Sequence, residues 1–173
     1  TEARRWRLHV LWPLVMAIVL LLRVWPLYRL SAEEWSRLKY GEIYLSVQKM
    51  GEEIGKNLQP GETFYELGYE PGLYYYSGRR PPTGILMADH WETGPLQAQL
   101  MSRIIKDLER NQPELLVTTR FWIANAEHAQ LPLTQWCMAH YRPFPRDARH
   151  GPFLLLARKG GALESRLTAA RPD

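Results

Sequence analysis

The sequence predicts an α/β protein in which one N-terminal transmembrane helix precedes a small Rossmann-like three-layer domain with a short parallel or mixed sheet. Two observations lead to this prediction. An apolar run of thirteen residues, 10–22, lies near the start of the chain. After it, short apolar segments alternate with longer segments whose apolar residues recur at helical spacing. Strands that alternate with helices are typical of a small sheet with helices on its faces.

The first helix is expected over residues 8–28, a length that suits a membrane span of about 20 residues. Arg23 near its end can extend its charge to the interface. Trp12, Trp25 and Tyr28 fit an aromatic belt. A signal peptide and a soluble helix are the alternatives. No small-residue cleavage site follows the apolar run, and a core helix is not normally apolar on every face.

The net charge of +4 belongs to this first segment. Residues 1–30 contain five arginines and one glutamate, whereas residues 31–173 contain 17 basic and 17 acidic side chains. Basic residues before a span favour a cytoplasmic start, so the following domain is expected outside the cytoplasm. Because that domain has no charge excess, a nucleic-acid partner is not expected.

The expected organisation has three parts. Residues 1–30 form a transmembrane helix with a basic cytoplasmic flank, residues 31–160 an extracytoplasmic α/β domain, and residues 161–173 a flexible, glycine-led tail. The chain begins with Thr rather than Met. We therefore expect a fragment whose first helix is the last span of a longer membrane protein.

The elements of the α/β domain follow from local patterns. Ser31 to Glu34 form a capping box that starts a helix. Apolar residues at intervals of four and three predict a helix over 42–58, which Pro60 and Gly61 end. Strands are predicted over residues 63–67, 84–88, 115–118 and 153–158. Further helices are predicted to open at residues 94–95 and to cover residues 121–129 and 133–140.

Motifs for catalysis or cofactors are weak. Neither a glycine-rich dinucleotide loop nor a P-loop is present, so we expect no cofactor. Asp89, His90 and Glu92 could ligate a divalent ion, but no second cluster completes the set, and a solvated loop is the simpler interpretation. The three histidines at 128, 140 and 150 are isolated and are expected to be surface or packing residues. The single cysteine, Cys137, lies in an apolar helix and is expected to be buried.

The segment over residues 74–80 is the candidate binding site. Its residues expected to bind substrate are Tyr74, Tyr75, Tyr76, Arg79 and Arg80. Tyrosine rings offer flat faces to sugars, and arginine binds phosphate through two parallel hydrogen bonds. Beside a membrane, the expected ligands are a lipid phosphate or a glycan. In the alternative interpretation, the tyrosines pack under a strand end and the arginines are solvated.

Several motifs occur in order. F-Y-E-L-G-Y-E-P-G-L-Y-Y-Y-S-G-R-R-P over residues 64–81 follows a helix that ends in L-x-P-G-E. A D-L-x-x-x-x-P-E turn over 107–114 then precedes an apolar strand, and L-T-Q-W-C-M-A-H-Y-R-P covers 133–143. Over about residues 8–158, the chain resembles the last membrane helix and C-terminal extracytoplasmic domain of bacterial multi-span membrane glycosyltransferases. That family is related to protein O-mannosyltransferases and to the lipid A aminoarabinose transferase.

The resemblance implies an inner-membrane enzyme that transfers a sugar from a polyprenyl-phosphate carrier to an extracytoplasmic acceptor. The family's catalytic carboxylates lie in loops near the start of the full protein, and no part of this sequence matches them. The chain is therefore expected to be an accessory domain, inactive by itself, whose partners are the bilayer and, through the rest of the enzyme, the sugar carrier or a glycan or lipid acceptor. The alternative is a single-span anchored binding domain without enzymatic activity. A free-standing hydrolase is disfavoured because no nucleophile constellation is present.

Overall fold

The computed structural model describes residues 2–144 and 151–169. The chain divides into two compact units, Thr1–Leu45 and Ser46–Asp173, which we call the N-terminal unit and the α/β unit. The first unit extends beyond residue 30, where the domain boundary was expected.

The N-terminal unit consists of helices. They are α1 (Glu2–Val24), the 3-10 helix η1 (Trp25–Arg29), α2 (Ala32–Tyr40) and the first turn of α3 (Glu42–Asn57). Over Leu11–Arg29 the mean hydropathy is 1.8 and none of the segment is buried. Among the described residues, this helix alone has the length and composition to cross a membrane, and a signal sequence would have the same properties.

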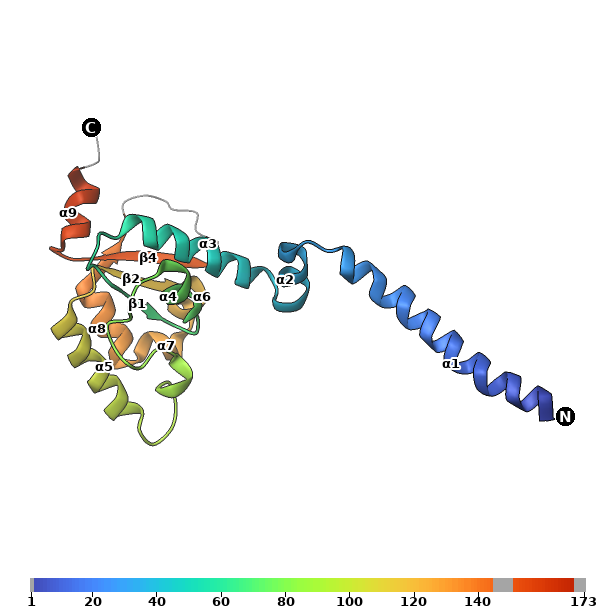
Figure 1. Cartoon of the computed structure of the whole chain (residues 1–173). Coiled ribbons are helices and arrows are strands. Elements are labelled where there is room, and N and C mark those ends of the chain that lie inside the picture. The colour runs from blue at the N-terminus through green and yellow to red at the C-terminus, as the bar shows by residue number, and fades with distance from the viewer. Residues whose placement is uncertain (1, 145–150, 170–173) are drawn as a thin grey trace. The chain divides into compact units, whose positions relative to one another are not determined.

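The α/β unit contains a four-stranded mixed sheet (Figure 1). Its strands are β1 (Phe64–Leu67), β2 (Leu115–Thr119), β3 (Tyr141–Pro143) and β4 (Phe153–Arg158). The strand order is β1-β2-β4-β3, with β1 parallel to β2 and the other two pairs antiparallel. Of the two expected arrangements, a parallel or a mixed sheet, the structure has the mixed one.

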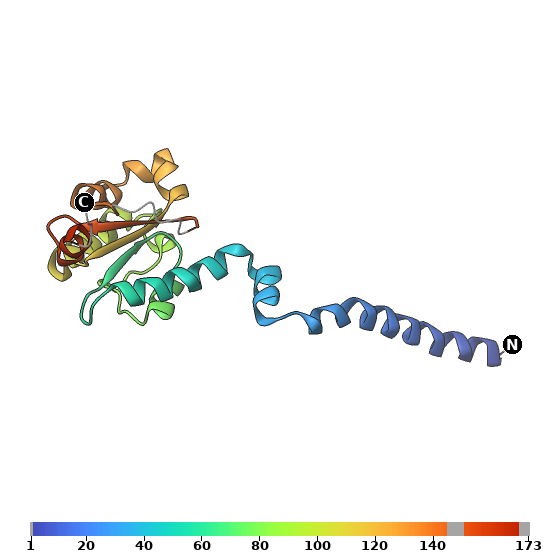
Figure 2. The same cartoon turned by 90° about the horizontal axis from the view of Figure 1, so that it is seen from above.

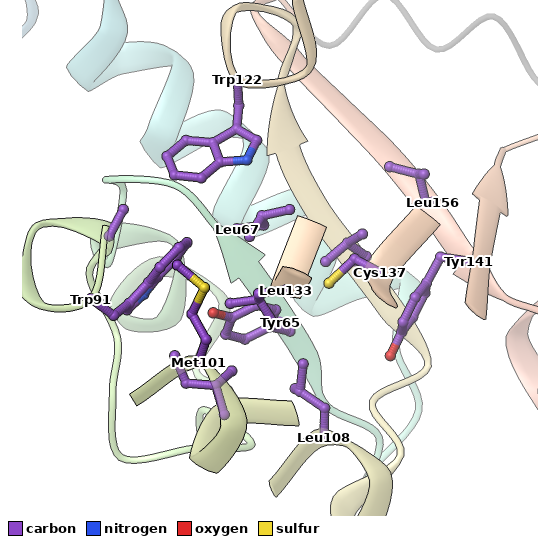
Figure 3. Packing of buried hydrophobic residues seen from close by; sticks show 13 residues of the cluster. Tyr65, Leu67, Trp91, Met101, Leu108, Trp122, Leu133, Cys137, Tyr141 and Leu156 are labelled. Carbon is purple, nitrogen blue, oxygen red and sulfur yellow. The ribbon is translucent and has the colours of Figure 1, made fainter. Parts of the chain in front are cut away.

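Helices cover both faces of this sheet (Figures 1 and 2). The remaining elements are α4 (Gly72–Ser77), η2 (Ala88–His90), α5 (Gln97–Asn111), α6 (Arg120–Ala124), α7 (Ala126–Gln130), α8 (Pro132–His140) and α9 (Ala162–Ala169). Successive strand residues point to opposite faces. Phe64 and Val117 thus pack with α3, α4 and α9, whereas Tyr65 and Leu116 pack with α5 and α8. Figure 3 shows the second cluster, which includes Cys137; this thiol is buried, as predicted.

Two local predictions are wrong. Residues 84–87 form no strand, and Ala88 begins η2. The Ala88 N–H donates to the carbonyl of Gly68, the residue after β1, at 2.9 Å, and among the described residues the segment takes no part in the strand pairing. The single helix expected over 121–129 is two short helices. They divide at Asn125, whose side chain accepts hydrogen bonds from the N–H groups of Glu127 and His128 and so caps a new helix.

The expected C-terminal tail contains a packed helix, α9. Leu163 is buried against the sheet, and its N–H donates to the Glu114 carboxylate at 2.9 Å. Arg166 makes two hydrogen bonds to Glu62, of 2.6 and 2.7 Å. The polar composition of residues 161–169 gives no sign of these partners, because Glu62 and Glu114 are far away in the sequence. Their contacts hold α9 to the rest of the unit. Residues 170–173, the rest of the expected tail, and His150 lie outside the described residues.

Candidate functional site

Helix α4 contains the three tyrosines of the candidate segment, and they differ in exposure. Tyr74 is buried, stacks on the Phe64 ring at 4.5 Å, and accepts a hydrogen bond of 2.9 Å from the Glu66 N–H. Tyr75 is 82% exposed and contacts the edge of the half-buried Tyr76 ring at 5.1 Å. Tyr74 is thus part of the core, and Tyr75 presents its ring to solvent.

The two arginines of the segment also differ. The Arg79 guanidinium donates to the carbonyl oxygens of Gln59 and Gly55 at 2.8 and 3.0 Å, and also to that of Leu58. These carbonyls end helix α3, where the last turn leaves acceptors without helical partners. Arg79 therefore caps α3, whereas Arg80 is exposed.

Close packing of α3 and α4 positions this segment. A Cβ atom on Gly51 would lie 2.5 Å from the Tyr76 Cβ, and one on Gly55 would lie 2.9 Å from the Ser77 carbonyl oxygen. Two glycines four residues apart on one helix face thus let the α4 backbone approach. Sequence reasoning missed this role, although the spacing of the two glycines was the available signal.

A buried carboxyl lies in β1. Glu66 is 2% exposed, and burial raises the pKa of its side chain to about 8. One of its oxygens has no hydrogen-bond partner among the described residues. Burial also raises the pKa of Glu70, which follows the strand. A pKa of about 8 favours the protonated, neutral form of Glu66 at pH 7, near the carboxyl end of β1. An acidic residue inside an apolar strand was the signal that sequence reasoning passed over.

A second polar cluster joins three segments at the same end of the sheet. His128 Nε2 lies 2.5 Å from one Glu92 carboxylate oxygen, and the Tyr69 hydroxyl donates to the other. The Trp122 ring stacks on the His128 ring at 4.0 Å. Glu92 thus pairs with a histidine far away in the sequence, whereas Asp89, its expected partner in metal binding, is exposed. Among the described residues, no group of three potential metal ligands occurs.

The Glu92–His128 pair has the groups of an acid–base dyad but little access to a substrate. A general acid or base has to come within hydrogen-bond reach of the group it protonates or deprotonates. The His128 side chain is 7% exposed, and its Nδ1 atom is buried without a partner in the described part of the chain. The arrangement therefore ties the loops after β1 and η2 to helix α7, and it offers no open catalytic centre.

A cavity of about 340 Å³ is lined by residues of α5, α8 and the end of β4. Its wall includes Trp136, whose ring stacks on His140 at 4.1 Å. Its two cations have partners within the chain: Lys159 donates to the Ala139 carbonyl at 2.7 Å, and Arg158 pairs with the Glu114 carboxylate. A phosphate bound here would compete with these contacts, which makes the cavity poorly suited to an anionic ligand.

The fold and these geometries define a mixed α/β unit that follows an exposed apolar helix. Comparison with known proteins returned no match among family models, curated proteins or solved structures.

Proposed function

We propose that the chain is the C-terminal part of an integral-membrane glycosyltransferase that transfers a sugar from a polyprenyl-phosphate carrier to an extracytoplasmic acceptor. In this proposal, α1 crosses the bacterial inner membrane. The α/β unit, a Rossmann-like three-layer accessory domain without the catalytic carboxylates, lies outside the cytoplasm. The observation that carries the proposal is the exposed apolar stretch Leu11–Arg29 at the start of the chain, ahead of a compact α/β unit. The motif over residues 64–81 supports it.

The side chains of the motif over residues 64–81 differ in exposure, which supports separate structural and ligand-binding roles for them. Buried residues such as Phe64 and Tyr74 maintain the fold, and Arg79 caps α3. Tyr75 and Arg80 remain exposed on the surface of the unit. A ring face and a guanidinium are groups that contact a sugar and a phosphate. We therefore assign contact with the carrier or acceptor to Tyr75 and Arg80.

The proposal is tested in membranes of the source organism, prepared with and without residues 46–173 of the chain. Transfer of labelled sugar from polyprenyl phosphate to endogenous acceptors is measured in both. We expect transfer to fall when the α/β unit is removed while the membrane part remains inserted. The alternative, an anchored binding domain without enzymatic activity, predicts equal transfer in the two membranes, and that result would contradict the proposal.

Topology gives a second test. Because the arginines before the apolar run favour a cytoplasmic start, a reporter fused after residue 173 should lie outside the cytoplasm. A reporter that is active only after export should be active, and a reporter that is active only in the cytoplasm should be silent. The opposite pattern would show that the α/β unit is cytoplasmic and would exclude an extracytoplasmic role.

A further inference from the structure

The segment directly after the apolar helix exposes large apolar and aromatic side chains. We call residues 31–44 the aromatic segment; it comprises α2 and the start of α3. Trp35 and Leu38 of α2 are 42% and 62% exposed, and Tyr40 at its end is also exposed. Single exposed apolar residues are common, but a group this dense on a short helix points to a contact surface.

Helix α2 has two different faces. Trp35 and Leu38 are three residues apart and therefore lie on the same face. Glu33 and Arg37 are four apart on the opposite face, where they form an ion pair of 3.2 Å. Arg37 also pairs with Glu42 at 2.5 Å, and these contacts keep the charged groups together. The helix is thus apolar on one side and charged on the other, a pattern found in helices that lie in the plane of a membrane interface.

The short connection to the apolar helix limits what can cover the apolar face. Only Leu30 and Ser31 separate η1 from α2. Arg29 and Ala32 are three residues apart, so their Cα atoms lie at most about 11 Å from each other. The headgroup region on each side of a bilayer is itself about 5–7 Å thick. If α1 crosses a membrane, α2 therefore begins close to the headgroup layer, and lipid is an apolar surface within reach of Trp35 and Leu38.

Aromatic residues and cations are combined along the same stretch. Arg29 lies over the Trp25 ring at 5.6 Å, and the Lys39 ammonium lies over the Tyr40 ring at 5.0 Å. The amphipathic rings of Trp and Tyr favour the headgroup level, and Lys and Arg side chains extend to the same depth. The composition of the stretch thus matches the boundary between acyl chains and headgroups.

We propose that the aromatic segment is a second membrane-contacting element, which lies in the headgroup layer with Trp35 and Leu38 turned toward the acyl chains. This inference rests on the proposed role of α1 as a membrane span. Its partner is the bilayer surface that α1 crosses. The segment would fix the depth of the chain at the point where the α/β unit begins, independently of what that unit binds.

The test places a nitroxide spin label on the full chain in vesicles of phosphatidylethanolamine and phosphatidylglycerol. Three single variants are labelled: Leu38→Cys on the apolar face, Glu33→Cys on the charged face, and Val19→Cys in α1. The native Cys137 is buried, and the unmodified chain labelled in parallel measures any reaction there. Collision of each label with oxygen, which is concentrated in lipid, is compared with collision with a water-soluble nickel chelate.

The expected result is a severalfold higher ratio of oxygen to nickel accessibility at position 38 than at position 33, with position 19 deepest. Equal, water-like values at positions 33 and 38, with a lipid-like value at position 19, would overturn the inference and leave the membrane span intact. A water-like value at position 19 would overturn both. The three labels therefore distinguish failure of the inference from failure of the proposed anchor.

Discussion

Arg79 and Arg80 are adjacent in the sequence and have different surroundings in the structure. Arg79 donates hydrogen bonds to carbonyls at the end of α3, and Arg80 is exposed. Both arginines were expected to bind substrate. In the structure Arg79 has a structural role, and Arg80 is accessible to a ligand. A positively charged side chain at a helix C-terminus stabilises the helix when it donates hydrogen bonds to carbonyls that would otherwise lack partners.

The two arginines can be separated by matched substitutions. Arg79→Gln should lower the free energy of unfolding by about 1.5 kcal/mol, the low end for hydrogen bonds from a charged group, because the side chain is partly exposed. Arg80→Gln should change it by less than about 0.5 kcal/mol. Chemical denaturation of both variants measures these values. Equal losses would refute the capping role of Arg79.

Glu66 should make stability depend on pH. The pKa of its carboxyl is about 8 in the folded chain, compared with an ordinary value of 4.5. Between these values, the folded state keeps a proton that the unfolded state releases. Stability from this group is therefore fully present below pH 4.5 and is lost as pH rises toward about 8, at about 1.4 kcal/mol per unit of pKa difference.

Glu66→Gln keeps a neutral side chain of the same shape and should remove this dependence. The unfolding midpoint of the variant should vary less with pH than that of the parent chain. Glu109→Gln, at an exposed position on α5, serves as the control and should follow the parent. A pH profile for Glu66→Gln that coincides with the parent profile would show that Glu66 is ionised in the folded state.

At the scale of elements, the packing of α3 on α4 decides where the candidate segment lies. Gly51 and Gly55 leave room for the α4 backbone, and the apolar residues of α3 then reach the sheet. The apolar stripe over 42–58 predicted which side of α3 is buried. It did not predict that α4 would lie against α3, because that contact depends on two glycines whose effect appears only when the helices meet.

Gly51→Ala should destabilise the chain although alanine favours helices. Helix propensity would add roughly 1 kcal/mol of stability. The new methyl group would lie 2.5 Å from the Tyr76 Cβ, and overpacking of this kind typically costs about 1–3 kcal/mol. We expect a net loss measurable by thermal unfolding. At Gly84 a Cβ would meet no atom within 4 Å, so Gly84→Ala should leave the melting temperature nearly unchanged. A more stable Gly51→Ala variant would contradict the close approach.

At the scale of the whole molecule, each unit has its own kind of surface. The apolar side chains of Leu11–Arg29 face outward, whereas those of the α/β unit form two clusters on either side of its sheet. An outward apolar surface favours a lipid environment, and an internal core stabilises a domain in water. The N-terminal unit therefore favours a lipid environment, and the α/β unit favours water.

Residues 46–173 expressed alone should fold in water without detergent. A single cooperative unfolding transition and a monomeric size on gel filtration are the expected observations. Because the proposed function makes this unit an accessory domain, the same fragment should transfer no sugar from polyprenyl phosphate by itself. Aggregation in the absence of detergent would show that the fragment lacks a complete core, and transfer that survives removal of contaminants would contradict the accessory role.

The sequence by itself determined the features that depend on near neighbours. The capping box at Ser31 starts α2, and the apolar runs at 63–67, 115–118 and 153–158 correspond to strands β1, β2 and β4. Apolar periodicity and caps are local properties, since each residue acts on others within a turn or a strand. The apolar helix near the start follows from composition in the same way.

Tertiary structure alone decided the features that depend on distant partners. The run over 84–88 has the composition of a strand but pairs with none, whereas α9, which is polar in sequence, packs because Glu62 and Glu114 meet its residues. The candidate segment separated into core, capping and exposed residues in the same way. Local composition indicates which secondary structure a residue prefers. The roles of the buried Glu66, the capping Arg79 and the Glu92–His128 pair depend on long-range contacts. These contacts exist only once the chain has folded.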